Sequence, residues 1–307
     1  MNVGFMGRTR MLLDTINIIR HDDTHQIAFI WTSKSEPYYN CHEDEFQHVA
    51  QRLNCPFIYS SNIDGIDKGI DLSKVDLVIS INFVNILSAT FLNQFQFGVL
   101  NAHAGDLPRY KGNACPNWAI LNDENSISLS IHQMSAELDS GPIYTTRIFP
   151  LNDNTYIGDV YNWLGLEVPR GFLDVINSIQ KGVSPTPQKD VRSLRTFPRK
   201  AEDAEIDWCQ GIESIHRLIR ASSRPFDGAY CHLNGTIDNR VTVFKARVIE
   251  LPYDFCAING QILERHKDSF VVASGNSALE VFDFKLNELT QTESLKKITA
   301  SLRNRLT

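Results

Sequence analysis

Alternating apolar and polar segments in the first half of the chain predict strands separated by helices. Short apolar runs bounded by turn residues are typical of buried strands, and apolar residues three or four apart are typical of helices. The first such segments are Val3–Met6, Leu12–Ile19, Gln26–Trp31, Glu43–Leu53 and Phe57–Tyr59. Because strands that alternate with helices form parallel sheets, this order predicts an α/β fold with a Rossmann-like, mostly parallel sheet.

The same pattern continues through the middle of the chain. A proline near the middle of the longest apolar stripe, Pro169, predicts a kink in that helix. In the alternating strand before it, His132 shares a face with serines and is expected at the surface or beside a site. The predicted segments are the strand Asp76–Ile81, the loop Asn82–Leu87, the helix Ser88–Phe95, the helix Cys115–Leu121, the strand Ser126–Met134 and the helix Ile157–Ile179.

The second half of the chain has a different pattern. Residues 181–200 contain three prolines among basic side chains, a composition typical of a linker. Short strands joined by glycine turns follow and predict a small OB-like β-barrel. These strands are Ala229–Leu233, Val241–Glu250, Gln261–Leu263, Ser269–Ala273 and Ala278–Phe284. The expected organisation is therefore an N-terminal domain over residues 1–185, a linker over 186–200 and a smaller C-terminal domain over 201–307.

The charge balance bears on the partners of the protein. The 307 residues have a formal net charge of -6, with 30 Lys and Arg against 36 Asp and Glu. An acidic chain argues against a broad nucleic-acid footprint. Arg8 and Arg10 interrupt the apolar residues near the N-terminus, so neither a signal segment nor a membrane span is expected.

The cysteines and histidines bear on the compartment and on metal binding. Six dispersed cysteines without CxxC spacing are typical of reduced thiols, which predicts a cytoplasmic protein. Cys41, His42 and His48 lack a fourth ligand at suitable spacing and are interpreted as an exposed helix face. We therefore expect neither a metal nor a membrane partner.

The candidate chemistry lies where a strand ends. Val99 and Leu100 are apolar, and Asn101 and His103 follow at alternate positions, so both side chains point to one side. Open α/β sheets bind ligands at the carboxyl ends of their strands. An amide can donate to an oxyanion and an imidazole can accept a proton near neutral pH, as an acyl transfer requires. Because a histidine at a strand end is more often structural than catalytic, this pair alone does not decide the function.

The surrounding residues resemble the folate-dependent formyltransferases, which include methionyl-tRNA, glycinamide ribonucleotide and sugar N-formyltransferases. The family pattern is Asn-x-His, then Leu-Pro-x-Tyr/Trp-x-Gly, then Asp-x-Gly. Asn101–His103, Leu107–Gly112 and Asp139–Gly141 match it. Residues 199–208 and 215–229 are similar to the second half of the longer family members. The resemblance therefore covers nearly the whole chain.

The resemblance implies that Asn101, His103 and Asp139 transfer a formyl group from N10-formyltetrahydrofolate, a co-substrate, to a primary amine. His103 is the expected general base, Asn101 the expected donor to the oxyanion, and Asp139 the group that orients His103. In the family, the strand at 76–81 and the loop after it form the pterin pocket. The residues assigned to folate binding are Phe83, Val84, Asn85, Ile86, Leu87 and Asp139. The alternative is that the apolar members of this loop only close the core.

The identity of the amine depends on finer similarities. Asn117–Ile120, Arg220-Ala221 and Pro225–Ala229 look most like the sugar N-formyltransferase branch. This implies a nucleotide-linked amino deoxysugar of the dTDP-4-amino-4,6-dideoxyglucose type, a role in lipopolysaccharide O-antigen biosynthesis, and a homodimer. The alternatives are a methionyl-tRNA formyltransferase, which would have to neutralise many phosphates, and a formyltetrahydrofolate hydrolase, which would use the same three residues on water.

Five residues are candidates for binding the phosphates and sugar of such a substrate. Gly7, which precedes two of them, is expected to let the backbone approach the substrate closely. For the basic members, a solvated helix start or a polar loop rim is an equally good interpretation. The candidates are Arg8, Arg10, Arg109, Tyr110 and Lys111.

Overall fold

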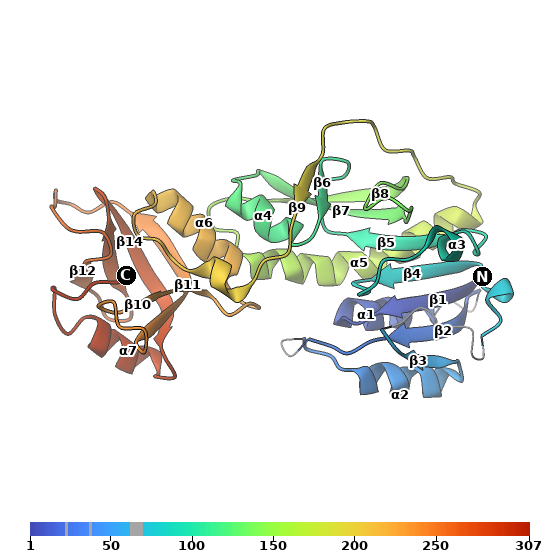
Figure 1. Ribbon diagram of the computed structural model, residues 1–307, viewed down its shortest axis with the longest axis horizontal. Coiled ribbons are helices and arrows are strands. Elements are labelled where there is room, and N and C mark those ends of the chain that lie inside the picture. The colour runs from blue at the N-terminus through green and yellow to red at the C-terminus, as the bar shows by residue number, and fades with distance from the viewer. Residues whose placement is uncertain (22–23, 37–38, 62–69) are drawn as a thin grey trace. The chain divides into compact units, whose positions relative to one another are not determined.

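The computed structural model describes residues 1–21, 24–36, 39–61 and 70–307 (Figure 1). Contacts within the chain divide it into two compact units. Unit 1 comprises Met1–Cys115, Ser126–Phe149 and Tyr161–Thr196, and unit 2 comprises Pro116–Asn125, Pro150–Val160 and Phe197–Thr307. Within the described residues, no helix is both long enough and apolar enough to cross a membrane.

Unit 1 contains a seven-stranded sheet with the order β3-β2-β1-β4-β5-β7-β8. The neighbours from β3 to β5 pair in parallel, and β5 pairs antiparallel with β7. The expected mostly parallel sheet is confirmed. Its strands are β1 (Asn2–Gly7), β2 (Gln26–Thr32), β3 (Phe57–Tyr59), β4 (Leu77–Ile81), β5 (Val99–His103), β7 (Ser126–Gln133) and β8 (Ile143–Pro150).

The helices of the first half follow the apolar pattern. The first helix buries Leu12, Leu13, Ile16 and Ile19, the face that the sequence predicts. The third begins at its cap Ser88, whose Oγ accepts from the Phe91 amide at 3.2 Å. It ends at Leu92 rather than at Phe95, because Asn93 leaves the helical conformation with ψ near 1°. The helices are α1 (Arg10–Ile19), α2 (Glu43–Leu53), the 3-10 turn η2 (Leu72–Lys74), α3 (Ala89–Leu92), α4 (Cys115–Leu121) and α5 (Ile157–Gln180), which continues through Pro169.

The parallel strands bring their carboxyl ends to one edge of the sheet. There Gly7 of β1 is the register partner of Ile81 of β4. Gly7 has φ +148°, and a Cβ on it would lie 1.9 Å from the Ile81 carbonyl oxygen. Close packing of two strand ends therefore accounts for this glycine without any substrate.

A second, two-stranded sheet in unit 1 joins distant parts of the chain. Strand β6 (Tyr110–Gly112) pairs in parallel with β9 (Leu194–Thr196). Strand β9 belongs to the segment that the sequence predicts to be a linker. This segment is therefore held against unit 1 at a loop next to His103.

Unit 2 is built on a five-stranded antiparallel sheet with the order β10-β11-β14-β13-β12. The sequence predicts a small OB-like β-barrel here, and the structure confirms a β-rich domain in the form of this antiparallel sheet. Buried apolar side chains of this sheet and of two helices form its core. Its elements are the 3-10 turn η3 (Ala201–Ala204), α6 (Ile212–Ser222), β10 (Ala229–His232), β11 (Arg240–Ile249), β12 (Ile262–Arg265), β13 (Phe270–Ser274), β14 (Ser277–Leu286) and α7 (Gln291–Ile298).

Two short segments from the first half of the chain also belong to unit 2. The Asn117 amide donates to the Ala221 carbonyl of α6 at 2.8 Å. Arg220 is buried, and its Nη1 donates to the Asn152 carbonyl at 2.8 Å. Residues that resemble the sugar N-formyltransferase branch, Asn117 and Arg220-Ala221, therefore contribute to the same set of contacts.

Candidate active site

Strand β5 carries both predicted catalytic side chains, Asn101 and His103. In the antiparallel pairing with β7, Asn101 lies opposite His132 and His103 lies opposite Ser130. His103 is 6% exposed. The two residues thus project from the end of a central strand, between the parallel part of the sheet and its antiparallel edge.

The His103 ring is fixed by a backbone carbonyl. Its Nε2 lies 2.8 Å from the Tyr110 carbonyl oxygen. A carbonyl only accepts, so Nε2 carries the proton in the neutral ring and donates it there. The other ring nitrogen, Nδ1, lies 3.5 Å from Asp139 Oδ2. Gly105 packs against this ring so closely that a Cβ would lie 2.3 Å from Nε2. Nδ1 is therefore the atom at which His103 can take up a proton.

Asp139 lies between the two histidines. Its Oδ2 accepts from the Gly112 amide at 2.9 Å, and its Oδ1 lies 3.7 Å from His132 Nε2. Its backbone is left-handed, with φ 49°. The resemblance placed Asp139 beside Asn101 and His103, and the structure brings these three residues together.

His132 completes the cluster, and of the two positions that the sequence allows for it, the surface or beside a site, the structure has the second. It is buried, and its Nδ1 donates to the Gln133 carbonyl at 3.0 Å. Burial, helped by the nearby His103, lowers the pKa of His132 to about 4. The ring is thus neutral at pH 7, and its Nε2 accepts from Asn101 Nδ2 at 3.3 Å. This contact turns the Asn101 amide so that one N–H points to His132, and the other has no partner among the residues that the structure describes.

Cys115 and Thr196 also lie beside His103. Cys115 Sγ is 3.6 Å from His103 Nε2 and 3.2 Å from Thr196 Oγ1. Burial raises the pKa of the Cys115 thiol to about 11. The thiol is therefore protonated at neutral pH and is not a nucleophile there. Neither residue carries a sequence signal, because a lone cysteine and a threonine in a linker are both common.

The loop after β4 has the composition that a flat heterocycle needs. Phe83 packs edge-on against Trp31, with ring centroids 5.0 Å apart, and Leu87 is buried. Val84 and Ile86 instead expose 40% and 91% of their surface. Part of the loop therefore closes the core, and part presents apolar side chains at the carboxyl edge of the sheet, where they can cover a ring.

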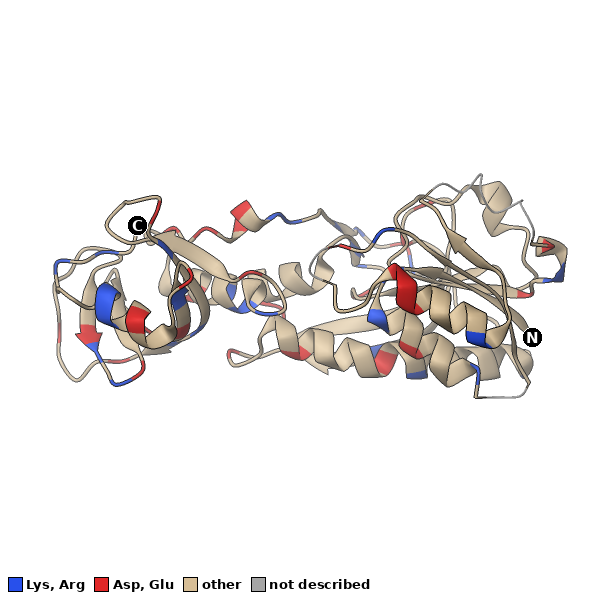
Figure 2. Cartoon of the chain, turned by 90° about the horizontal axis from the view of Figure 1, so that it is seen from below, with Lys and Arg blue, Asp and Glu red and all other residues tan. Residues whose placement is uncertain are grey.

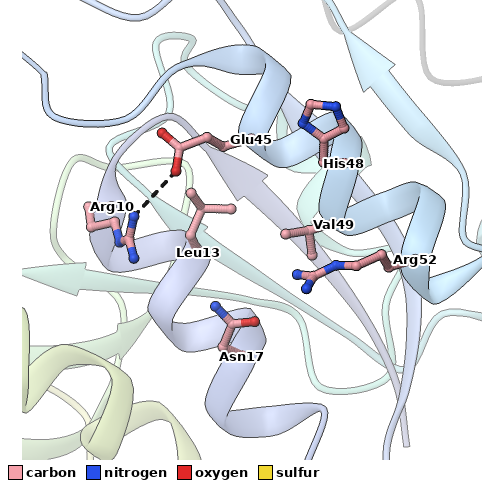
Figure 3. Close-up of a pocket in the computed structure, with 7 residues that line it drawn as sticks. All are labelled: Arg10, Leu13, Asn17, Glu45, His48, Val49 and Arg52. Atoms are coloured by element: carbon pink, nitrogen blue, oxygen red, sulfur yellow. Dashed lines mark hydrogen bonds and ion pairs between the residues drawn. The ribbon is translucent and has the colours of Figure 1, made fainter.

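The candidate substrate-binding residues fall into two groups. Arg8 Nη1 is 2.9 Å from Glu36, and Arg10 is 3.2 Å from Asp14 and 3.3 Å from Glu45. Arg10 also lines an open groove of about 250 Å³ between α1 and α2 (Figure 3). The other lining residues are Leu13, Asn17, Glu45, His48, Val49 and Arg52. Both arginines thus have carboxylate partners within the protein.

The second group lies on the loop that touches His103. The Arg109 guanidinium stacks over the Tyr110 ring at 4.8 Å. Lys111 Nζ donates to Ser140 Oγ at 2.7 Å, next to Asp139. Of the two groups, this one reaches the predicted catalytic residues. Within the part of the chain that the structure describes, no three His, Cys, Asp or Glu side chains are grouped as metal ligands.

Comparison with known families and proteins gives a consistent picture. A family model described as "Formyl transferase" matches residues 1–176, and "Formyl transferase, C-terminal domain" matches residues 199–298. Methionyl-tRNA formyltransferase of Bartonella henselae is 26% identical over 289 residues, which cover 92% of this chain and 91% of that protein.

Solved structures share the fold. The N-formyltransferase of Helicobacter canadensis, in complex with folinic acid and dTDP-3-aminofucose, has a TM-score of 0.68 against this chain at 17% identity. The match covers 93% of this chain and 100% of that one. HypX of Aquifex aeolicus, in complex with tetrahydrofolic acid, has a TM-score of 0.64 at 18% identity. That match covers 97% of this chain and 47% of HypX, so this chain spans about half of HypX.

Proposed function

Since the chain belongs to the formyl transferase family and is a formyltransferase, we propose that it formylates the primary amine of a nucleotide-linked amino deoxysugar. The formyl donor is N10-formyltetrahydrofolate, and the products are a formamido sugar and tetrahydrofolate. The observation that carries the proposal is the arrangement of Asn101, His103 and Asp139, with His103 Nδ1 3.5 Å from the carboxylate. On this assignment the product enters lipopolysaccharide O-antigen biosynthesis.

Each residue of this cluster has a defined task in the transfer. The folate supplies the formyl carbonyl. As the amine attacks the formyl carbon, His103 Nδ1 accepts its proton, and Asp139 stabilises the imidazolium that forms. When the tetrahedral intermediate collapses, the bond between the formyl carbon and N10 breaks, and the imidazolium returns its proton to N10, which leaves as tetrahydrofolate. The free N–H of Asn101 donates to the formyl oxygen as negative charge develops, an interaction worth about 3 kcal/mol in comparable acyl-transfer sites. Because His132 and Tyr110 already hold the amide and the ring, neither group must reorganise during the reaction.

The loop of Phe83–Leu87 supports the assignment of the folate. Val84 and Ile86 are exposed apolar side chains beside the carboxyl end of β4, where a pterin would need contacts on its faces. Two proteins of the same fold, from Helicobacter and Aquifex, are described in complex with folinic acid and tetrahydrofolic acid. We assign the backbone groups of this loop to the polar edge of the pterin.

Charge favours a sugar nucleotide over tRNA as the amine substrate. The net charge is -6. Figure 2 shows Lys and Arg interspersed with Asp and Glu on the elements of both units. A protein that binds tRNA has to neutralise many phosphates, whereas a nucleoside diphosphate sugar presents only two. The second candidate is methionyl-tRNA formyltransferase, which is favoured by the relative from Bartonella over 92% of this chain.

A direct assay distinguishes these functions. The enzyme is mixed with N10-formyltetrahydrofolate and with dTDP-linked 3-amino and 4-amino deoxysugars, initiator methionyl-tRNA, or water alone, and tetrahydrofolate release is followed. We expect a sugar nucleotide to gain the mass of one formyl group. Formylation of the tRNA, with salt-sensitive binding, would instead support the second candidate, and release without an acceptor would identify a hydrolase.

The loop of Arg109 and Lys111 provides the first prediction. If these cations bind the diphosphate, Arg109→Gln and Lys111→Gln should each raise the KM for the sugar nucleotide about tenfold, with little change in the KM for the folate. Steady-state kinetics with each substrate varied in turn provides the measurement. Arg10→Gln is the matched control, since Arg10 pairs with Asp14 and Glu45. Equal effects on both KM values would show that the loop has no phosphate role.

A further inference from the structure

Residues 186–196, here called the strap, join the two loops that surround the Asp139 carboxylate. At one end, Thr186 and Ile143 exchange two backbone hydrogen bonds of 2.8 Å. At the other end, β9 pairs with β6. The strap is therefore anchored at both ends by backbone contacts that do not depend on its side chains.

Between these anchors, Gln188 reaches the Asp139 loop. Its Nε2 donates to the Asp139 carbonyl at 2.8 Å and to the Gly141 carbonyl at 2.7 Å. Both amide protons are thus used on one short loop. Its Oε1 is buried and accepts no hydrogen bond from the residues that the structure describes. What Gln188 contributes is therefore a pair of donors.

The Asp139 loop needs such support because its backbone is constrained. Asp139 has φ 49°, a left-handed conformation that a side chain makes less favourable. The loop also packs tightly, since a Cβ on Gly141 would lie 1.8 Å from the Gln133 carbonyl oxygen. The conformation places the carboxylate on the Gly112 amide and beside His103. Loss of the Gln188 bonds would free this loop to relax.

The other end of the strap holds the opposite side of the same carboxylate. Thr196 Oγ1 donates to the Lys111 carbonyl at 3.1 Å, and the Thr196 carbonyl accepts from the Asn113 amide at 3.2 Å. These bonds flank Gly112, whose amide donates to Asp139 Oδ2. The strap therefore fixes both the loop that bears the carboxylate and the loop that binds it.

We propose that Gln188 is a positioning residue for Asp139, acting through the Asp139 and Gly141 carbonyls rather than by touching the substrate. The inference rests on the proposed function, in which Asp139 supports His103. It assigns a positioning role to a segment whose composition is typical of a linker.

The first test does not involve catalysis. Gln188→Met keeps the length of the side chain but removes both donors. Gln180→Met makes the same change at the exposed end of α5. Hydrogen exchange measured by mass spectrometry on the complete protein should be at least about threefold faster at residues 137–142 in Gln188→Met, and unchanged in Gln180→Met. Unchanged exchange in both variants would overturn the proposal.

The second test separates positioning from binding. We expect kcat to fall about tenfold in Gln188→Met, as for the loss of two hydrogen bonds, with unchanged KM values. Because Gln188 acts through Asp139, adding Gln188→Met to Asp139→Asn should cost nothing more. Full additivity of the two changes, or normal kcat in Gln188→Met, would overturn the proposal. If Gln188→Met does not fold, as judged by circular dichroism, Gln188→Glu provides the same readouts with a side chain of equal size.

The same experiment keeps the two levels of inference apart. If Asp139→Asn retains full turnover, the proposed function loses its triad whatever Gln188 does. If Asp139→Asn is impaired while Gln188→Met resembles the wild type in exchange and in kcat, only the role of Gln188 is wrong.

Discussion

Each unit contains a cluster of histidine and carboxylate, and the two clusters differ in how completely their charges are paired. In unit 2, His266 Nε2 lies 2.8 Å from Glu264 and its Nδ1 lies 3.2 Å from Glu280. The hydrogen bonds with Glu264 and Glu280 raise the pKa of His266. Burial acts to raise the pKa of Glu280, but the hydrogen bonds from Ser269, Arg247 and His266 outweigh it and lower this pKa. These charges are paired within the protein and join β11, β12 and β14.

In unit 1, one carboxylate is shared by two rings at longer distances. Asp139 lies 3.5 Å from His103 and 3.7 Å from His132, and burial keeps His132 neutral by lowering its pKa to about 4. The remaining polar contacts of these rings are with the Tyr110 and Gln133 carbonyls, the Asn101 amide and the Cys115 thiol. The same residue types therefore form a directly bonded ion network in unit 2 and a more loosely paired cluster in unit 1, which is the one that we propose moves a proton.

The largest expected difference between the clusters is in turnover. We predict that His103→Ala lowers turnover at least about a hundredfold, because the base is lost, while its melting temperature stays within a few degrees of the wild type. His266→Ala should do the reverse, with normal turnover and a lower melting temperature. Asn101→Ala should resemble His103→Ala. Tetrahydrofolate release and thermal unfolding provide the two measurements. Near-normal turnover of the His103→Ala variant would show that His103 is not the general base.

The fold was largely predictable from the sequence because local patterns determine it. Alternation of strands and helices identified the parallel sheet, and glycine-bounded short strands identified the antiparallel one. Strand β8 was missed, since its apolar residues occur in adjacent pairs instead of alternating with polar ones, and one of them, Ile148, is exposed. The end of α3 was placed three residues too late, because nothing in the sequence marks where Asn93 leaves the helix.

Only the site residues that belong to the family motif could be predicted from the sequence. Asn101, His103 and Asp139 lie in recognisable patterns, and their proximity agrees with that interpretation. The burial of His132 and the contact made by Gln188 were not predicted, for different physical reasons. Burial of His132 depends on β7 pairing with β5, and its alternation with serines looked like a polar face. Gln188 lies 49 residues from Asp139 in a proline-rich segment, where sequence gives no sign of a tertiary contact.

A smaller effect is expected at His132, which orients the Asn101 amide. His132→Leu removes the acceptor and should lower turnover about tenfold. His132→Gln offers an amide oxygen at a similar distance from the backbone and should recover part of the loss. The comparison of kcat for the two variants provides the measurement. Equal impairment of both would mean that the amide is not held through this contact.

His132 should also make the folding stability of the protein more sensitive to acid. Its folded pKa of about 4 lies below the ordinary value of 6.5, so the unfolded chain takes up this proton first as the pH falls. Stability should therefore decrease from pH 6.5 towards pH 4 in the wild type. His132→Gln cannot titrate and should lose less over that range. Chemical unfolding of both proteins at several pH values tests this, and parallel curves would contradict it.

The smallest expected effect is the contribution of the unit 2 cluster to folding stability, and its pH dependence differs from that of His132. Because the folded pKa of His266 is raised, its contribution to stability is fully present below its ordinary value of 6.5 and is lost as the pH rises through the folded value. The pKa of Glu280 is lowered, so its contribution is present above 4.5 and is lost as the pH falls through the folded value. Both contributions are therefore complete together between about pH 4.5 and pH 6.5, and each declines outside that range.

The difference in unfolding free energy between the wild type and His266→Gln isolates this network from all other titrating groups. It should be greatest near pH 5.5 and shrink on both sides, because on the alkaline side the imidazolium is lost and on the acid side its carboxylate partners are protonated. Its size should be modest, since His266 is partly exposed and solvent screens its ion pairs. High salt should reduce the difference further. A difference that is independent of pH and salt would show that His266 stabilises the sheet by packing alone, and that the two clusters do not differ in the way their charges are paired.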